Sequence, residues 1–271
     1  MRCAKCGRLL SEEGVCQCGF TPFMGHVNLF SELLPTQAAE LTSIFTKDWK
    51  CGPDGHLFLR RKSCTWGPKR PTYTMSTPAK HAVLNSLTDN AAVGDERNFV
   101  RISEKSSGLP YRGNIIVEPD RQYEVYIYFH NNASSTYNDK EHDYVGVARD
   151  VRLSSVFPTS LKKGQEGLVR GTFSSTNTDP PSVWAGAYIT ATEDMTLHYV
   201  EGSAKIYHGW QANGRVLSVN LFSKMGTFIG MNELNGVVPG CDDFSGQVVY
   251  TIQTRAVKQK AGGETSEEIA V

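Results

Sequence analysis

The feature that most constrains the fold is a recurring alternation of apolar and polar residues. In QYEVYIYFHN (122–131), Tyr123, Val125, Ile127 and Phe129 alternate with more polar neighbours. A period of two places successive side chains on opposite faces of a β-strand, so one face of this segment is expected in a core. Similar runs recur at 98–103, 113–119, 147–157, 167–175, 184–191, 196–200, 203–210, 215–222 and 247–257.

Turn-forming residues separate these runs. Glycine, proline, asparagine and aspartate occur in nearly every gap, and no long helical period interrupts the series. Many short strands with turn signals between them are typical of antiparallel β-sandwiches. We therefore predict a mainly β protein whose sandwich domain spans residues 78–257, followed by a polar, flexible tail at 258–271.

The first eighteen residues contain four cysteines with metal-ligand spacing. Cys3 and Cys6 form one close pair and Cys16 and Cys18 a second, and a glycine follows each pair. Four thiolates in two tight turns form a closed tetrahedral site, for which zinc is the common occupant. Two disulfides or free thiols are the alternatives, but cysteines this close together make poor disulfides. The spacing predicts a structural zinc site in residues 1–20.

The segment between the cysteines and the sandwich has mixed patterns. Residues 21–49 include Leu41, Ile44, Phe45 and Trp49 at helical spacing, which predicts a short amphipathic helix. The following sequence contains a GPDG turn signal and predicts a small hairpin. Residues 50–77 as a whole are expected to form this hairpin and a proline-containing linker.

The linker region is rich in cations. Trp66 and Tyr73 are interleaved with basic residues at Lys50, Arg60, Arg61, Lys62, Lys69, Arg70 and Lys80. Cations mixed with aromatic rings could follow a phosphate backbone and stack on bases. The whole chain, however, has 28 basic and 28 acidic residues, so no global field attracts nucleic acid. A solvated linker is the favoured interpretation.

Two further sets of residues are candidate metal ligands. Cys51, His56 and Cys64 could form a second metal site or a disulfide, although a fourth local ligand is missing. The loop at 130–144 concentrates oxygen donors suited to calcium, at Asn131, Asn132, Asn138, Asp139, Glu141 and Asp143. Their spacing matches no EF-hand, and long polar loops are usually solvated. Calcium is therefore a less favoured cofactor than zinc.

Catalytic motifs are not recognisable in the chain. The sequence contains no GxSxG, HExxH, GxxxxGK[ST] or GxGxxG motif placed as catalysis requires. Cys241, beside Asp242 and Asp243, is the best candidate nucleophile. Single cysteines in strand-rich proteins are mostly inert small apolar residues. We therefore expect a protein without catalytic residues, with an enzyme centred on Cys241 as an alternative.

Two parts of the chain resemble known families. Residues 1–20 resemble the short zinc ribbons that open many prokaryotic proteins. The stretches VEPDRQYEVYIYFHNNASSTYND and VARDVRLSSVFPTSL resemble Ig-like repeats of unknown function, related to cell-adhesion domains, on bacterial and archaeal surface proteins. The matching positions are Tyr123–Asn131, Ala148, Asp150, Val151, Leu153 and Phe157–Pro158. This resemblance implies an Ig-like sandwich that is not catalytic.

The expected function is structural or interactive. A sandwich can present loops or edge strands, such as 113–117 or 215–221, to another molecule, and the zinc ribbon can serve as a docking knob. Self-association or a protein partner is the first expectation and a glycan the second. A nucleic-acid-associated factor is the alternative. With no stretch of about 18 apolar residues and no secretory signal at residues 1–20, we expect a cytoplasmic protein; the surface-repeat resemblance makes leaderless export the alternative.

The predicted zinc site can be checked directly. Protein purified under reducing, chelator-free conditions is expected to contain about one zinc per chain by elemental analysis, because four thiolates saturate with one ion. Cys3→Ser is expected to lower the zinc content while leaving the β-rich circular dichroism spectrum unchanged. A zinc content near zero in the unsubstituted chain would contradict the prediction.

Overall fold

The computed structural model describes residues 49–51, 57–59 and 65–257. The chain divides into two compact units, Met1–Cys64 and Thr65–Val271. In the first unit, β1 (Trp49–Cys51) pairs antiparallel with β2 (Leu57–Leu59), in the segment where a hairpin was predicted. Trp49 begins a strand instead of ending the expected helical segment. The predicted zinc ribbon, the rest of the helical segment and the tail lie outside the described residues.

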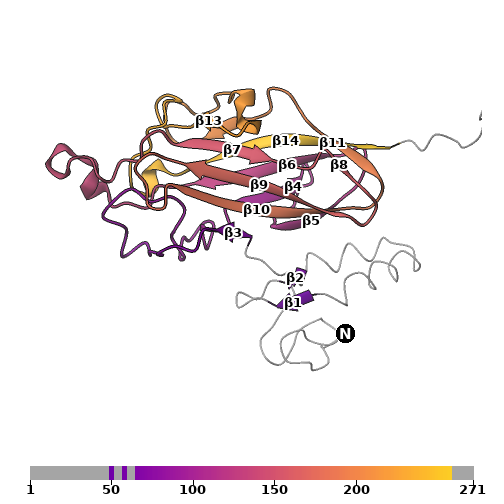
Figure 1. Cartoon of the computed structure of the whole chain (residues 1–271), viewed down its shortest axis with the longest axis horizontal. Coiled ribbons are helices and arrows are strands. Elements are labelled where there is room, and N and C mark those ends of the chain that lie inside the picture. Colours follow the sequence, from indigo (N-terminus) through magenta and orange to yellow (C-terminus); the bar gives the residue numbers. More distant parts are fainter. Residues whose placement is uncertain (1–48, 52–56, 60–64, 258–271) are drawn as a thin grey trace, which may run out of the picture. The chain divides into compact units, whose positions relative to one another are not determined.

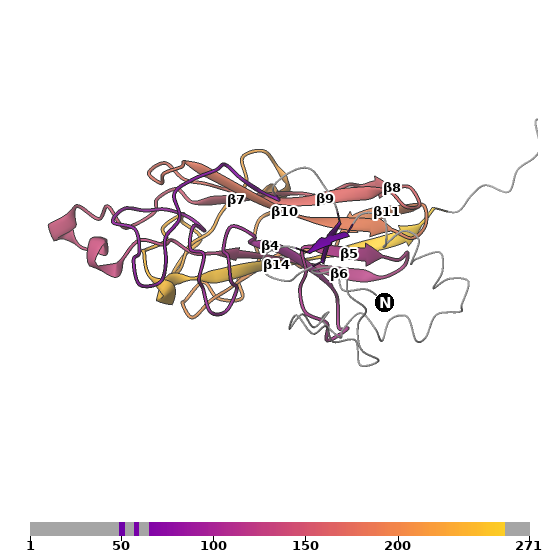
Figure 2. The same cartoon turned by 90° about the horizontal axis from the view of Figure 1, so that it is seen from below.

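The second unit contains two β-sheets that face each other (Figures 1 and 2). The first, here called the β9 sheet, has the order β13-β7-β9-β10-β3, and β5 also pairs with β10. Its strands are β3 (Trp66–Gly67), β5 (Asn114–Val117), β7 (Arg152–Val156), β9 (Glu166–Ser174), β10 (Ser182–Ala191) and β13 (Thr227–Phe228). All its pairings are antiparallel except that of β5 with β10.

The second sheet, here called the β14 sheet, has the order β4-β6-β14-β11-β8, and β12 also pairs with β14. Its strands are β4 (Val100–Glu104), β6 (Gln122–Phe129), β8 (Ser160–Leu161), β11 (Met195–Tyr199), β12 (Lys205–Tyr207) and β14 (Gly246–Ala256). All its pairings are antiparallel. The described residues therefore form a mainly β, sandwich-like fold, as the alternating pattern predicted.

The core lies between the two sheets. Phe173 of β9 lies 5.3 Å from Phe99 and 6.3 Å from Phe129, measured between ring centroids. Gly171 lets the sheets approach closely, because a Cβ there would lie 3.0 Å from Val100 and 3.2 Å from Ile127. The side chains that alternate with these core residues point outward, so each sheet also presents an outer face.

The strand predicted at 215–222 is wrong. Val216 makes only an isolated bridge to Lys205, and Val219–Phe222 forms the 3₁₀ helix η4. Ser218 caps this helix by accepting a hydrogen bond from the Asn220 N–H at 3.2 Å. Val216 and Val219 are 52% and 63% exposed, so the valines of the run do not enter the core. In the run at 203–210, only Lys205–Tyr207 (β12) forms a strand. Every other predicted run also contains a strand.

Residues 68–98, here called the strap, join β3 to β4. The strap wraps round the end of the sandwich from which the 3₁₀ helices η2 (Ser135–Asn138) and η3 (Lys140–His142) project (Figures 1 and 2). Its contacts with the rest of the unit include the isolated bridges Ala79–Ala133 and Leu84–Asn131. Part of the expected linker, residues 65–77, thus belongs to the second compact unit. Within the described ranges, no helix is long and apolar enough to cross a membrane.

Candidate functional site

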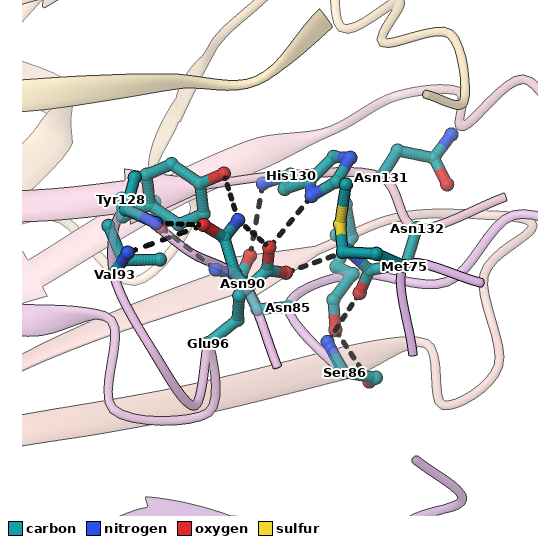
Figure 3. Close-up of polar contacts among 12 residues, drawn as sticks. Met75, Asn85, Ser86, Asn90, Val93, Glu96, Tyr128, His130, Asn131 and Asn132 are labelled. Carbon is teal, nitrogen blue, oxygen red and sulfur yellow. Dashed lines mark hydrogen bonds and ion pairs between the residues drawn. The ribbon is translucent and has the colours of Figure 1, made fainter. Parts of the chain in front are cut away.

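Polar residues from the strap and from the end of β6 form a buried cluster (Figure 3). The strap contributes four of its members, and the residues that follow β6 contribute three. We call this group the Glu96 cluster; it consists of Asn85, Ser86, Asn90, Glu96, His130, Asn131 and Asn132, all of which are buried. So many buried polar groups require hydrogen-bond partners, because burying them without partners costs folding free energy.

Glu96 is the centre of the cluster, and its side chain is 0% exposed. Its Oε1 accepts a hydrogen bond from Asn90 Nδ2 at 2.7 Å and lies 2.8 Å from His130 Nδ1. Its Oε2 accepts from Asn132 Nδ2 at 2.7 Å. A carboxylate that receives three contacts is best satisfied as the ionised acceptor, so His130 Nδ1 carries the hydrogen. These donors replace the water that the buried carboxylate loses.

Asn131 and Asn132 satisfy backbone groups where regular pairing ends. Asn131 Nδ2 donates to the carbonyl oxygens of Gly146 at 2.7 Å and Val238 at 2.8 Å, and its Oδ1 accepts from the Val83 N–H at 3.1 Å. The oxygen of Asn132 accepts from the Ser86 N–H. These amides take the place of a strand ladder and join segments that are far apart in the sequence.

Arg70, which was expected in the basic linker, lies in the strap, is buried, and donates hydrogen bonds to other strap residues. Its guanidinium donates to the Asn85 carbonyl oxygen at 2.7 Å, the Pro68 carbonyl oxygen at 3.0 Å and Ser86 Oγ at 2.9 Å. Burial and the charge of Arg97 lower the pKa of Arg70 to about 10, so it stays charged at neutral pH. Because Arg70 is buried and makes these three contacts, it is not accessible as the nucleic-acid contact considered above.

The Glu96 cluster is closed to other molecules. His130 is 2% exposed, and its Nε2 has no hydrogen-bond partner in the described part of the chain. A crevice beside the cluster is too narrow for a water-sized group; it is lined by Val93, Glu96, Asn98, Phe99, Arg101, Tyr126 and Tyr128. A Glu–His pair has the chemistry of an acid–base catalyst, but here no substrate reaches it. Its geometry supports a structural role.

Accessible aromatic residues occur on the outer face of the β14 sheet. Val125 and Ile127 of β6 enter the core, so Glu124 and Tyr126 point to the other side. Strand register places Tyr126 opposite Arg101 and Val249, and Val249 opposite Lys205. Two residues along β12, Tyr207 is 39% exposed. We call this surface the tyrosine face; its members are Arg101, Tyr111, Glu124, Tyr126, Lys205, Tyr207 and Val249.

Two tyrosines of this face, Tyr111 and Tyr126, pack against each other. The rings of Tyr111 and Tyr126 lie 5.1 Å apart between centroids, at an interplanar angle of 37°. Tyr111 donates its hydroxyl hydrogen to Glu124 Oε2 at 2.8 Å. Burial, followed by this hydrogen bond, raises the pKa of Tyr111 above its usual range, and burial raises the pKa of Tyr126. The hydroxyls therefore stay protonated, and the face combines flat apolar rings with neutral donors.

Cys241 is not joined to an acid–base group in the described structure. Its thiol is free and half-buried, and the backbone φ of 109° is unusual for a residue other than glycine. His208, from the loop after β12, is committed elsewhere. Its Nδ1 accepts from the Trp210 N–H at 3.0 Å, and its Nε2 lies 3.2 Å from the Gly230 carbonyl oxygen. His208 is thus not available as a base for this thiol.

Four of the six candidate calcium ligands are used in other contacts, and the other two, Glu141 and Asp143, are exposed. Asn131 and Asn132 belong to the Glu96 cluster, Asn138 Nδ2 donates to the Gly240 carbonyl oxygen at 2.7 Å, and Asp139 Oδ1 accepts from the His142 N–H at 3.0 Å. The described residues contain no group of three or more His, Cys, Asp and Glu side chains suited to a metal ion. Cys3, Cys6, Cys16, Cys18, His56 and Cys64 lie outside the described residues, and Cys51 lies in β1.

Sequence reasoning missed both the Glu96 cluster and the tyrosine face. The usable signals were Glu96, an acidic residue three positions before the apolar Phe99, and Tyr126, an aromatic residue at a position alternating with the core. Comparisons of the chain with protein families, with curated proteins and with solved structures found no match. The fold and its surfaces therefore define the class of protein: a β-sandwich with a polar cluster sealed at one end.

Replacing the central carboxylate tests the structural role of the cluster. Glu96→Gln places an amide nitrogen against hydrogen-bond donors and removes a buried charge, so the free energy of unfolding is expected to fall by about 2–4 kcal/mol. Urea denaturation followed by circular dichroism measures this change. The matched control is Glu104→Gln, whose carboxylate is partly exposed 3.8 Å from Arg121; it is expected to cost less than about 1 kcal/mol. Equal effects of both substitutions would contradict the role.

His208 predicts a pH dependence of stability. Burial lowers the pKa of His208 below its usual value near 6.5, so the unfolded chain binds this proton more readily than the folded chain. Its contribution to stability is complete above pH 6.5 and declines as the pH falls from 6.5 to the folded-state pKa. His208→Asn is expected to weaken this decline in urea titrations between about pH 7.5 and 5. The control is His198→Asn, at an exposed histidine, which should leave the decline of stability with falling pH unchanged. If His208→Asn does not alter this decline, His208 is not its source.

Proposed function

We propose that this chain is a non-catalytic interaction protein whose tyrosine face is its binding surface. The observation that carries the proposal is the grouping of Tyr111, Tyr126 and Tyr207 on one outer sheet face. Tyrosine is favoured at interfaces because its ring supplies contact area at low entropic cost while its hydroxyl makes hydrogen bonds. The face belongs to strands of the sandwich, and such rigid elements suit recognition better than loops.

Two other features support a binding role over catalysis. The Glu–His pair with catalytic chemistry is sealed inside the Glu96 cluster, and Cys241 has no histidine bonded to its thiol in the described structure. The resemblance to Ig-like surface repeats favours the same interpretation, since it implies a sandwich that is not catalytic. We further propose that Cys3, Cys6, Cys16 and Cys18 hold a structural zinc, which would give the protein a second folded element for bridging two partners.

Nucleic-acid binding is the less favoured function. The cations of the predicted basic linker suggested nucleic-acid binding, but one of them, Arg70, is buried and donates hydrogen bonds to Asn85 and Ser86 of the strap. The tyrosine face itself carries Glu124 beside Arg101 and Lys205 and is not strongly cationic. Affinity for a phosphate backbone depends on several unopposed cations.

The proposal is tested by measuring association with and without the exposed tyrosine. The full chain is examined by light scattering for self-association and by retention on neutral polysaccharides for glycan binding. Tyr207→Ala is expected to weaken whichever association is found by about tenfold, since aromatic anchors contribute much of the binding energy. The control is Tyr144→Ala, which removes a tyrosine exposed in a loop.

An association that is unaffected by Tyr207→Ala would contradict the proposed surface. Absence of self-association and of polysaccharide retention, together with DNA or RNA binding that weakens steeply with salt, would favour the nucleic-acid alternative.

A further inference from the structure

Two opposite charges on the tyrosine face have no ion-pair partner in the described part of the chain. Glu124 accepts the Tyr111 hydroxyl at 2.8 Å, but no cation lies within salt-bridge distance of it. Lys205 is half-buried and likewise has no carboxylate within that distance. The third charge, Arg101, donates to the Val93 carbonyl oxygen. By the same measure Arg101 has no ion-pair partner among the described residues, so the face carries one anion, Glu124, and two cations, Lys205 and Arg101, beside its aromatic residues.

The strand register separates these two charges across the face. Glu124 lies on β6, whereas Lys205 lies on β12, with β14 between the two strands. Tyr126 and Val249, which are opposite each other in the register, lie between the charges. The face therefore has an apolar centre between Glu124 and Lys205, and Arg101 on β4 lies beyond Tyr126.

We propose that the tyrosine face binds the same face of a second copy of this chain. The two copies are related by a two-fold axis that lies in the plane of the face, runs diagonally to the strands and passes between Tyr126 and Val249. Rotation about this axis exchanges the positions of Glu124 and Lys205. Each Glu124 then lies opposite Lys205 of the second copy, and two equivalent ion pairs form around the apolar centre. Such self-complementarity is the requirement of an isologous dimer.

The remaining residues of the face are compatible with this rotation. Arg101 moves toward Gln247 of the second copy, so no two cations meet, and Tyr207 moves toward the region of Tyr111. The strands of the two copies cross at a steep angle, as in orthogonally packed sheets. A single neutral ligand would leave Glu124 and Lys205 without a counter-charge, which favours the second copy as the occupant.

This inference rests on the proposed function, because it names the partner of the proposed binding surface. Only a few side chains form the centre of the face, so a weak dimer is expected. Sedimentation velocity of the full chain from about 10 µM to about 1 mM should show a monomer–dimer equilibrium. Glu124→Lys and Lys205→Glu should each weaken dimerisation by at least about tenfold, because each homodimer then opposes like charges.

Recombining the charges gives the decisive measurement. A mixture of the Glu124→Lys and Lys205→Glu chains should form a mixed dimer. In that dimer the two substituted side chains, which have opposite charges, lie opposite each other, and the native Lys205 of one chain lies opposite the native Glu124 of the other. The double variant Glu124→Lys/Lys205→Glu should also recover homodimers. Lys163→Glu, a charge reversal at an exposed residue of the β8–β9 loop, should leave dimerisation unchanged. Circular dichroism confirms that each variant is folded.

The outcomes separate this inference from the proposed function. A chain that remains monomeric but loses polysaccharide retention in Tyr207→Ala would overturn the second copy as partner and keep the tyrosine face as a binding surface. Dimerisation that neither single charge reversal weakens would also overturn the second copy as partner. So would a mixture of the two single variants that does not form the mixed dimer. If Tyr207→Ala affects no association of any kind, both proposals fail.

Discussion

The burial of Glu96 is the interaction on which the end of the sandwich depends. A buried carboxylate is tolerated only if donors replace its water, and here Asn90, His130 and Asn132 do so. Two of these partners follow β6 and one comes from the strap, so the contacts can form only when the strap is closed. The strap has little regular pairing of its own, and its position is therefore specified by side-chain hydrogen bonds. Removing one member leaves several others without partners, which makes the cluster cooperative.

The strands could be predicted because apolar residues along them alternate with polar ones in the same order in which buried positions alternate with exposed ones. Along β6, Tyr123, Val125 and Ile127 are buried at alternate positions, and the same period identified most other strands. The error at 215–222 has the same origin. Val216 and Val219 are apolar but exposed, and capping by Ser218 stabilises a 3₁₀ turn that the alternation does not reveal.

The Glu96 cluster could not be predicted from periodicity. Asn131 and Asn132 lie in a polar loop whose sequence favoured solvation, with calcium ligation as the alternative. Their burial results from contacts with segments distant in the sequence, such as Val83 and Val238. Arg70 shows the same limit, since a cation in a proline-containing basic stretch is indistinguishable from a solvated one until its partners are known. Polar residues can be buried when long-range contacts provide the hydrogen bonds that water would otherwise provide.

The Glu96 cluster and the tyrosine face are physically connected. Asn90 donates to Glu96 and also, through the same nitrogen, to the Tyr128 hydroxyl at 3.2 Å, while its oxygen accepts from the Ala92 and Val93 N–H groups. Val93 in turn accepts a hydrogen bond from Arg101 on the tyrosine face. The turn of the strap that closes the cluster thus also holds the Arg101 side chain. If this turn opened, Arg101 would keep its charge but lose this acceptor, and its guanidinium would be free to move beside Tyr126. The sealed polar cluster thus fixes the position of a charged group on the proposed binding surface without itself lying on that surface.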